Sequence, residues 1–209
     1  MTKKSAAEEK IVELKNSASG ESPVRRKGIY LLPNLLTTGA LFAGFYAVLS
    51  GFSGKYELAA IAIFTAMVFD GLDGRVARMT NTQSAFGVQY DSLSDMVSFG
   101  VAPAVVAYGW GVSDLGTLGL AAAFVYASCG ALRLARFNVQ AESSDNKVFP
   151  GLPSPAAAAL VAGFVWSTYS MEPSVGLSVL GAILTAAAGL LMVSNFKYPS
   201  FKEIDMRDK

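Results

Sequence analysis

Long apolar runs fill most of this chain, and short polar or glycine-containing connections separate them. Each run approaches the roughly 20 residues that an α-helix needs to cross a bilayer. We place six such runs, at about 32–52, 57–77, 87–110, 115–136, 153–170 and 175–194. The pattern therefore predicts an all-α, polytopic membrane protein with six transmembrane helices.

The two ends of the chain are polar and differ from the apolar runs. Ser5 and Glu8 fit a helix capping box, and Ala7, Ile11 and Leu14 fall on one helical face. We expect a short amphipathic helix there, with a frayed polar tail as the alternative. The predicted organisation is an amphipathic helix and linker at 1–28, a six-helix transmembrane domain at 29–196 and a polar tail at 197–209.

Basic residues indicate how the chain is oriented in the membrane. Arg25, Arg26 and Lys27 stand just before the first run, and such residues collect on the cytoplasmic side of membrane proteins. If six spans alternate from there, Lys55 is the only Lys or Arg that falls on the other side. We therefore expect a multi-pass protein of the cell membrane with both termini in the cytoplasm.

Composition narrows the possible chemistry. Charged residues make up 16% of the chain, against about 25% in a typical soluble domain, and the net charge of +1 gives no support for nucleic-acid binding. The chain has no histidine, which excludes Ser-His-Asp and Cys-His catalysis and the usual zinc ligand sets. A metal site must then use oxygen ligands, which favour Mg²⁺ or Mn²⁺, with Ca²⁺ as a third option.

Four aspartates stand at the cytoplasmic ends of the second and third runs, namely Asp70, Asp73, Asp91 and Asp95. A carboxylate at membrane depth is costly, so it indicates a functional site. Helical periodicity places Asp70 and Asp73 on one stripe and places Asp91 and Asp95 on a stripe of the next helix. Packed together, the two helices would direct all four carboxylates to one point, where like charges need cations to coexist. We therefore expect a divalent-cation site that faces the cytoplasm.

Arg78 shares the stripe of Asp70 and Asp73, and two divalent ions beside a guanidinium suit a pyrophosphate group. Without histidine, direct in-line displacement by a hydroxyl is the simplest mechanism, with a carboxylate as its general base. The alternative is a divalent-cation transporter. Transporter sites usually lie near the midplane in interrupted helices, whereas these acids lie at helix ends beside an arginine that would repel a permeating cation.

Two further arginines, Arg133 and Arg136, end the fourth run on the cytoplasmic side. They are neighbours on one helical face, and we expect them to point into the same cavity and bind an anionic acceptor. The alternative is that they only fix the topology by lying near the lipid headgroups.

The spacing of the acidic motif resembles the signature of the CDP-alcohol phosphatidyltransferases. The matching pattern is Asp70-x-x-Asp73-Gly74-x-x-Ala77-Arg78, eight residues, then Gly87-x-x-x-Asp91-x-x-x-Asp95. The flanking segments RLARFN and FPGLPSPAAA are similar to the phosphatidylserine synthase branch, and the resemblance covers most of 25–199. It implies six core transmembrane helices, a homodimer and a cytoplasm-facing site for two divalent cations, Mg²⁺ or Mn²⁺.

Position by position, the resemblance also implies roles. Asp70 and Asp91 would bridge both metals, Asp73 would complete one of them, and Asp95 would complete the other and act as general base. The residues implied for CDP-lipid binding are Gly74, Arg78, Ser84 and Asn34.

The implied reaction joins a lipid donor to a small alcohol. CDP-diacylglycerol, or a CDP-archaeol-type lipid, would react with L-serine to give the phosphatidylserine-type lipid and CMP. Arg133 and Arg136 would bind the serine carboxylate. They suit glycerol 3-phosphate or inositol phosphate equally well, because those acceptors are also anionic.

Overall fold

The computed structural model describes residues 23–80, 82, 84–142 and 151–195, and the ordered elements in these ranges are all helical. The prediction of an all-α fold is confirmed for this part of the chain. The predicted amphipathic helix before residue 23 and the predicted tail after residue 196 lie outside the described residues.

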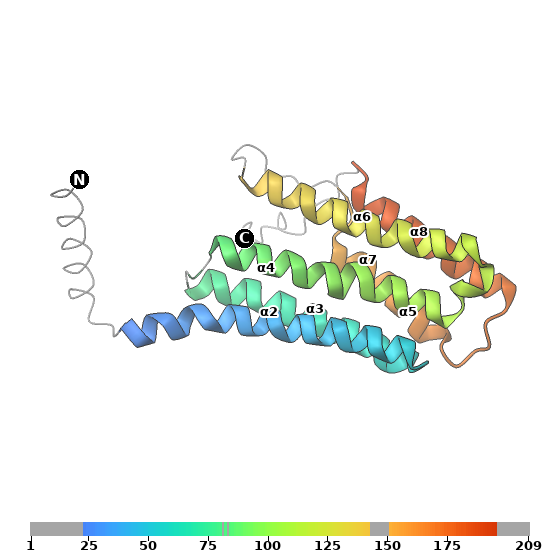
Figure 1. Ribbon diagram of the computed structural model, residues 1–209, viewed down its shortest axis with the longest axis horizontal. Coiled ribbons are helices and arrows are strands. Elements are labelled where there is room, and N and C mark those ends of the chain that lie inside the picture. The colour runs from blue at the N-terminus through green and yellow to red at the C-terminus, as the bar shows by residue number, and fades with distance from the viewer. Residues whose placement is uncertain (1–22, 81, 83, 143–150, 196–209) are drawn as a thin grey trace, which may run out of the picture.

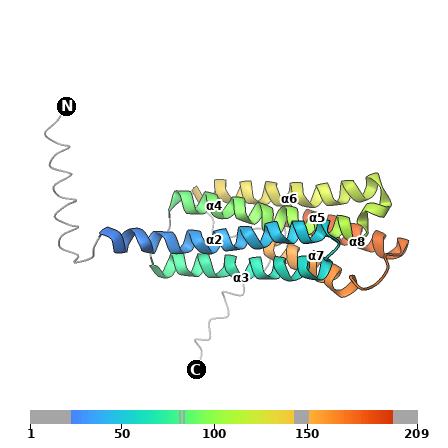
Figure 2. The same ribbon diagram turned by 60° about the horizontal axis from the view of Figure 1, so that its bottom comes forward.

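Antiparallel helices form one elongated bundle, in which successive helical columns run in opposite directions (Figure 1). In chain order the elements are α2 (Pro23–Phe52), α3 (Tyr56–Thr80), α4 (Ala85–Asp95), the π-helix η1 (Met96–Val101), α5 (Ala102–Trp110), the 3₁₀ helix η2 (Val112–Leu115), α6 (Thr117–Glu142), α7 (Ser154–Thr168) and α8 (Val175–Val193). The end of α3, the start of α4 and the end of α6 lie at the same end of the bundle as the start of α2 (Figure 2).

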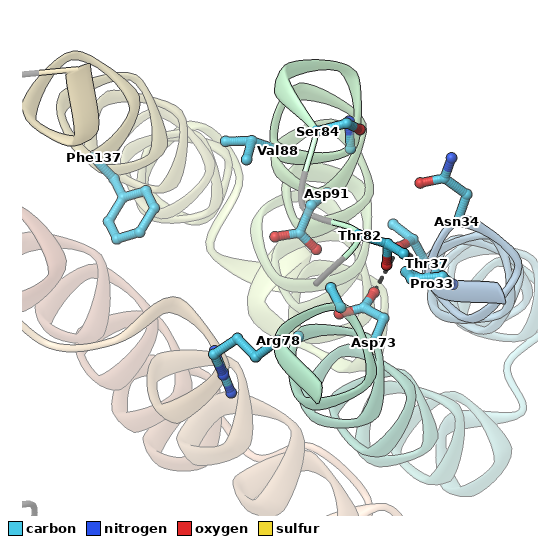
Figure 3. Close-up of a pocket in the computed structure, with 13 residues that line it drawn as sticks. Pro33, Asn34, Thr37, Asp73, Arg78, Thr82, Ser84, Val88, Asp91 and Phe137 are labelled. Atoms are coloured by element: carbon cyan, nitrogen blue, oxygen red, sulfur yellow. Dashed lines mark hydrogen bonds between the residues drawn. The ribbon is translucent and has the colours of Figure 1, made fainter. Parts of the chain in front are cut away.

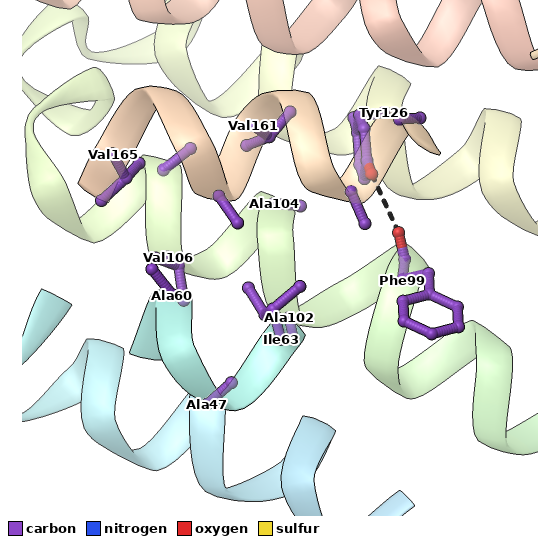
Figure 4. Close-up of a cluster of buried hydrophobic side chains, with 14 of the residues drawn as sticks. Ala47, Ala60, Ile63, Phe99, Ala102, Ala104, Val106, Tyr126, Val161 and Val165 are labelled. Atoms are coloured by element: carbon purple, nitrogen blue, oxygen red, sulfur yellow. Dashed lines mark hydrogen bonds between the residues drawn. The ribbon is translucent and has the colours of Figure 1, made fainter. Parts of the chain in front are cut away.

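The column formed by α4, η1 and α5 lies at the centre of the packing. Helix α2 packs along α3, α6 packs along α8, and the central column contacts α2, α6 and α7. Small side chains dominate the contact surfaces, as expected where membrane helices pack without a hydrophobic driving force between them. Fully buried examples around this column are Ala47, Ala60, Ala66, Ala102, Ala107 and Ala158, several of which Figure 4 shows.

Within the described residues, three helices are long and apolar enough to cross a membrane, and they cover Leu32–Phe52, Thr117–Gln140 and Val175–Val193. Helix α7 is apolar but shorter. Large apolar side chains such as Phe42, Phe52 and Phe124 are exposed on the bundle surface, where lipid would cover them. These features indicate a membrane protein. The count of six spans and the orientation stay predictions, because α3 carries its charged motif in its last turns and the predicted third span consists of three helical pieces.

The π-helix η1 follows directly after Asp95. Within it, the Ala102 N–H donates to the Val97 carbonyl five residues earlier, instead of the four that an α-helix uses. In an α-helix the Phe99 carbonyl would accept from residue 103, but Pro103 has no N–H. The Tyr126 hydroxyl of α6 donates to the Phe99 carbonyl instead, at 2.9 Å (Figure 4).

Two serines hold the central column against α2. Ser94 Oγ donates to the Thr37 carbonyl at 3.2 Å, and Ser98 Oγ donates to the Ala40 carbonyl at 3.1 Å. The backbones approach closely at Gly44, where an added Cβ would lie 2.6 Å from Ser98 Cα. The contact therefore requires glycine at position 44.

We expect Gly44→Ala to lower the free energy of unfolding by about 1–3 kcal/mol, because the new methyl group forces α2 away from η1. Thermal unfolding of the detergent-solubilised protein measures the change. Gly163→Ala is the matched control, since Gly163 is also helical and nothing lies within 4 Å of its added Cβ. Equal melting temperatures for the two variants would contradict the close contact.

Candidate functional site

Three aspartates meet where the last turns of α3 face α4. One carboxylate oxygen from each of Asp70, Asp91 and Asp95 lies within 4.8 Å of the others. Asp70 comes from α3, and the other two come from successive turns of α4. The sequence-based prediction that two helical stripes converge is confirmed for these three residues, which we call the aspartate cluster.

Asp73 lies beside the cluster but is held toward α2. Thr37 Oγ1 donates to Asp73 Oδ2 at 2.6 Å, and the aspartate is 5% exposed. Its charge is still close enough to act on the other three carboxylates. All four aspartates therefore belong to one electrostatic site, with Asp73 on its α2 side.

Thr37 is a site residue that the sequence reasoning missed. Its hydroxyl also lies 3.0 Å from the Pro33 carbonyl one turn earlier, which is the usual partner of a threonine inside a helix. Nothing in the sequence distinguishes that local bond from a contact with another helix. Only the packing of α2 against α3 shows that Thr37 orients Asp73.

A cavity of about 330 Å³ opens next to Asp73 and Asp91 (Figure 3). All four residues that the family resemblance implied for CDP-lipid binding line it. Helices α2, α3, α4 and α6 contribute to its lining, which comprises Pro33, Asn34, Thr37, Asp73, Gly74, Ala77, Arg78, Thr82, Ser84, Gly87, Val88, Asp91 and Phe137. The lining joins two carboxylates, one guanidinium, polar oxygens and an apolar wall, so it suits a ligand with a charged and an apolar part.

Polar side chains of the cavity lie over the two motif glycines. An added Cβ at Gly74 would lie 3.7 Å from the Arg78 guanidinium, so this guanidinium lies directly beside the glycine. At Gly87 an added Cβ would lie 3.1 Å from Ser84 Oγ and 3.6 Å from Asn34 Oδ1. These two polar side chains therefore lie together over the first turn of α4, where Ser84 also caps the helix by accepting from the Gly87 N–H at 3.0 Å.

The structure places Arg133 and Arg136 in different surroundings. Arg133 is half-buried, the charge of Asp95 acts on its guanidinium, and its Nη1 donates to Ser154 Oγ at 3.3 Å. Both terminal nitrogens of Arg136 donate to Asn195 Oδ1 at 3.2 Å, on the exposed side near the end of α8. Neither arginine is among the residues that line the cavity of Figure 3, and of the two it is Arg133 on which the charge of Asp95 acts.

Polar side chains also join the end of α6 to α4. Ser92 Oγ donates to Asn138 Oδ1 at 3.1 Å, and Asn138 Nδ2 donates to Gln89 Oε1 at 3.3 Å. These bonds lie one helical turn beyond Arg133. They hold the end of α6 beside the helix that carries Asp91 and Asp95.

The aspartate cluster fits a divalent cation. Its donors are carboxylate oxygens, which hard cations such as Mg²⁺ and Mn²⁺ prefer. Its residues are partly buried, and three like charges within 4.8 Å repel strongly unless a cation compensates them. Arg133 supplies one positive charge nearby, which leaves most of the negative charge for a metal.

This chain is similar to known proteins over most of its length. A family model described as CDP-alcohol phosphatidyltransferase matches residues 30–194. The CDP-diacylglycerol–serine O-phosphatidyltransferase of Helicobacter pylori strain J99 is 41% identical over 179 residues, which cover 84% of this chain and 75% of the relative. The Bacillus subtilis protein of the same name is 36% identical over 172 residues, covering 82% and 92%. The archaetidylserine synthase of Methanothermobacter thermautotrophicus is 37% identical over 170 residues, covering 80% and 69%.

We expect Thr37→Val to weaken Mn²⁺ binding about tenfold, because Asp73 then loses the hydroxyl that orients it. A titration followed by electron paramagnetic resonance of free Mn²⁺ measures the affinity of the detergent-solubilised protein. Thr38→Val is the matched control, since the Thr38 hydroxyl bonds to the Asn34 carbonyl and to Tyr90 and not to an aspartate. If both variants bind Mn²⁺ equally well, Thr37 does not orient a metal ligand.

Proposed function

This chain belongs to the CDP-alcohol phosphatidyltransferase family, and we propose that it transfers the phosphatidyl group of CDP-diacylglycerol, or of a CDP-archaeol-type lipid, to L-serine. The products would be the phosphatidylserine-type lipid and CMP. The observation that carries the proposal is the aspartate cluster beside a cavity lined by the remaining motif residues. Family membership favours this reaction over the divalent-cation transporter.

Two divalent cations, Mg²⁺ or Mn²⁺, would be held by the four aspartates. We assign Asp70 and Asp91 to both ions, Asp73 to one of them, and Asp95 to the other. When bound, the cations would neutralise the pyrophosphate oxygens and make the phosphorus more electrophilic. The fit rests on the clustered oxygens of three aspartates and on the proximity of the fourth.

The CDP part of the donor would occupy the cavity of Figure 3. Its volume of about 330 Å³ lies in the range of small-molecule sites. Gly74 lines the cavity without a side chain, the Arg78 guanidinium beside it supplies the positive charge for phosphate oxygens, and Ser84 and Asn34 supply polar groups. Val88 and Phe137 form an apolar wall on another side, which suits a donor that also carries lipid chains.

Asp95 would act as the general base. Its carboxylate would take the proton of the serine hydroxyl while the serine oxygen bonds to the phosphorus of the phosphatidyl group. The bond to the CMP phosphate breaks in the same step, and CMP leaves with the electron pair. This direct displacement needs no covalent enzyme intermediate, in keeping with a chain that has no histidine.

The acceptor carboxylate would bind near Arg133. Its guanidinium lies near Asp95, so a carboxylate bound there would place a serine hydroxyl close to the proposed base. Arg136 is the second acceptor-binding candidate, although its side chain bonds to Asn195 in the structure. Serine is preferred over glycerol 3-phosphate and inositol phosphate because the relatives are named for serine products or substrates.

The same proposal places the chain in the cell membrane. We propose six spans, a homodimer surrounded by membrane lipid, and cytoplasmic positions for both termini and the site. The site and the positively charged residues Arg75, Arg78, Arg133 and Arg136 share one end of the bundle, which agrees with a cytoplasmic location for that end.

An acceptor panel tests the proposed function. Purified protein receives CDP-diacylglycerol, Mn²⁺ or Mg²⁺, and one of serine, glycerol 3-phosphate, inositol phosphate or inositol, and CMP release is followed. We expect release with serine alone, loss of release when a chelator removes the metal, and no turnover in Asp95→Asn. CMP release with a different acceptor would support phosphatidyl transfer but rule out serine as the acceptor. If the folded protein releases no CMP with any acceptor, the result favours the transporter. A liposome assay of Mn²⁺ uptake then tests that alternative.

We expect Arg133→Ala to raise the KM for serine about tenfold, because the carboxylate loses a charge-assisted hydrogen bond. The KM for the CDP-lipid should change much less. Steady-state CMP release at varied serine and at varied CDP-lipid separates the two constants. Arg136→Ala provides the comparison and should have the smaller effect, since its guanidinium bonds to Asn195. Wild-type serine kinetics in Arg133→Ala would contradict the assignment of the carboxylate to this arginine.

A further inference from the structure

Asp95 is the last residue of α4, and the π-helix η1 begins with the next residue. The geometry of η1 therefore sets the direction in which the end of α4 presents the Asp95 carboxylate. A π-helical turn holds one more residue than an α-helical turn. If η1 relaxed to an α-helix, the two sides of the column would rotate by roughly 100° relative to one another.

Tyr126 of α6 contacts η1 at the point where its backbone departs from the α-helix. The side chain is fully buried, and its hydroxyl donates to the Phe99 carbonyl at 2.9 Å (Figure 4). That carbonyl is the one whose α-helical donor is missing, because residue 103 is proline. The hydroxyl of α6 thus takes the place of a backbone bond that an α-helix would have made.

Close packing fixes where Tyr126 itself lies. An added Cβ at Gly189 of α8 would lie 2.7 Å from Tyr126 Cα, so α8 supports the tyrosine from behind. On the other side, an added Cβ at Gly130 of α6 would lie 3.4 Å from Gly100 Cα in η1. The backbone of α6 is therefore held between α8 and η1, and Tyr126 has little freedom to follow a displaced carbonyl.

Helix α6 contacts the central column at two levels. Tyr126 bonds to the π-helix, and the charge of Asp95 acts on Arg133, which lies seven positions later on the same face of α6. Helix α6 therefore carries both the tyrosine that bonds to the backbone after Asp95 and the arginine on which the charge of Asp95 acts. A change at Tyr126 is expected to reach the aspartate cluster through this column.

We propose that Tyr126 is a positioning residue whose hydroxyl bond to the Phe99 carbonyl, together with Pro103, holds η1 in its π-helical geometry against α6 and thereby places the Asp95 carboxylate beside Asp70 and Asp91. The inference rests on the proposed function, in which Asp95 is a metal ligand and the general base. Tyr126 acts through the backbone and contacts neither substrate nor metal. Without the hydroxyl, we expect the Asp95 carboxylate to leave the position in which it would hold a cation together with the other two.

The experiment compares Tyr126→Phe with Tyr56→Phe. The second variant is a matched control, because the Tyr56 hydroxyl also donates to a backbone carbonyl of the central column, that of Gly109 at 2.6 Å, but at the end of the bundle away from the cluster. Binding of Mn²⁺ alone to the full chain is followed by electron paramagnetic resonance, without CDP-lipid or serine. Melting temperatures of both variants are measured in the same detergent.

We expect Tyr126→Phe to bind Mn²⁺ about tenfold more weakly than the wild type, and Tyr56→Phe to bind it as the wild type does. Both variants should lose a similar amount of thermal stability. In the CMP-release assay, Tyr126→Phe should lower kcat about tenfold and leave the KM for serine unchanged. Equal Mn²⁺ affinities for the two variants would overturn the inference and leave Tyr126 a packing residue.

A second variant covers the case in which Tyr126→Phe does not fold. Pro103→Ala provides an N–H that competes with the Tyr126 hydroxyl for the Phe99 carbonyl, and alanine favours the regular helix. We expect weaker Mn²⁺ binding in a protein that melts no earlier than the wild type, and unchanged binding would overturn the inference. Because Mn²⁺ alone is the probe, a wild-type chain that binds Mn²⁺ but does not use serine refutes only the proposed acceptor.

Discussion

Three carboxylates lie within 4.8 Å of one another between two helices of an otherwise apolar bundle, and their mutual repulsion has to be opposed by the surrounding structure. Separating α3 from α4 would relieve the repulsion. The bundle prevents this separation by close contacts between small residues and by hydroxyl groups that bond from one helix to the next. A divalent cation bound among the three carboxylates would compensate their charge.

The buried hydroxyl groups share one role, which is to join neighbouring helices close to the site. Ser94 and Ser98 bond to carbonyls of α2, Thr37 bonds to Asp73, and Tyr126 bonds to the π-helix. Each bond satisfies a buried polar group and also fixes the distance between two elements that carry site residues. Hydroxyl bonds to or from α2 and α6 therefore join the helices around the aspartate cluster, although neither α2 nor α6 contributes an aspartate to it.

The bundle has two chemically different ends. Aspartates, arginines and the cavity are gathered where α3 ends and α4 begins, whereas alanine contacts and apolar surface fill the remaining length. A lipid with a charged head matches this division, because its chains can stay with the apolar surface while its head enters the cavity. The cavity itself repeats the division on a smaller scale, with Asp73, Asp91 and Arg78 on some sides and Val88 and Phe137 on another.

The sequence by itself determined the helices and the four aspartates, because both depend on spacing along one chain. Apolar runs bounded by glycine, proline and polar residues place α3, α7 and α8 within a few residues of their predicted positions, and the repeat of Asp91 and Asp95 along one helix follows from helical geometry. The N-terminal extension of α2 to Pro23 and the division of the third run by η1 were not predicted. The sequence contains Pro103, but its effect on the helix could not be predicted, because the Phe99 carbonyl that it leaves without a donor is bonded by the Tyr126 hydroxyl of α6.

Only the tertiary structure decided which side chains orient the aspartates and which arginine lies near them. Arg133 and Arg136 are three positions apart, and this offset turns their side chains about 60° from one another on a helix, enough to direct one toward Asp95 and the other toward Asn195. Thr37 bonds to Asp73 and Tyr126 bonds to Phe99 across distances in sequence that no local pattern encodes. Such contacts arise when helices pack, since packing alone sets which faces of distant segments meet.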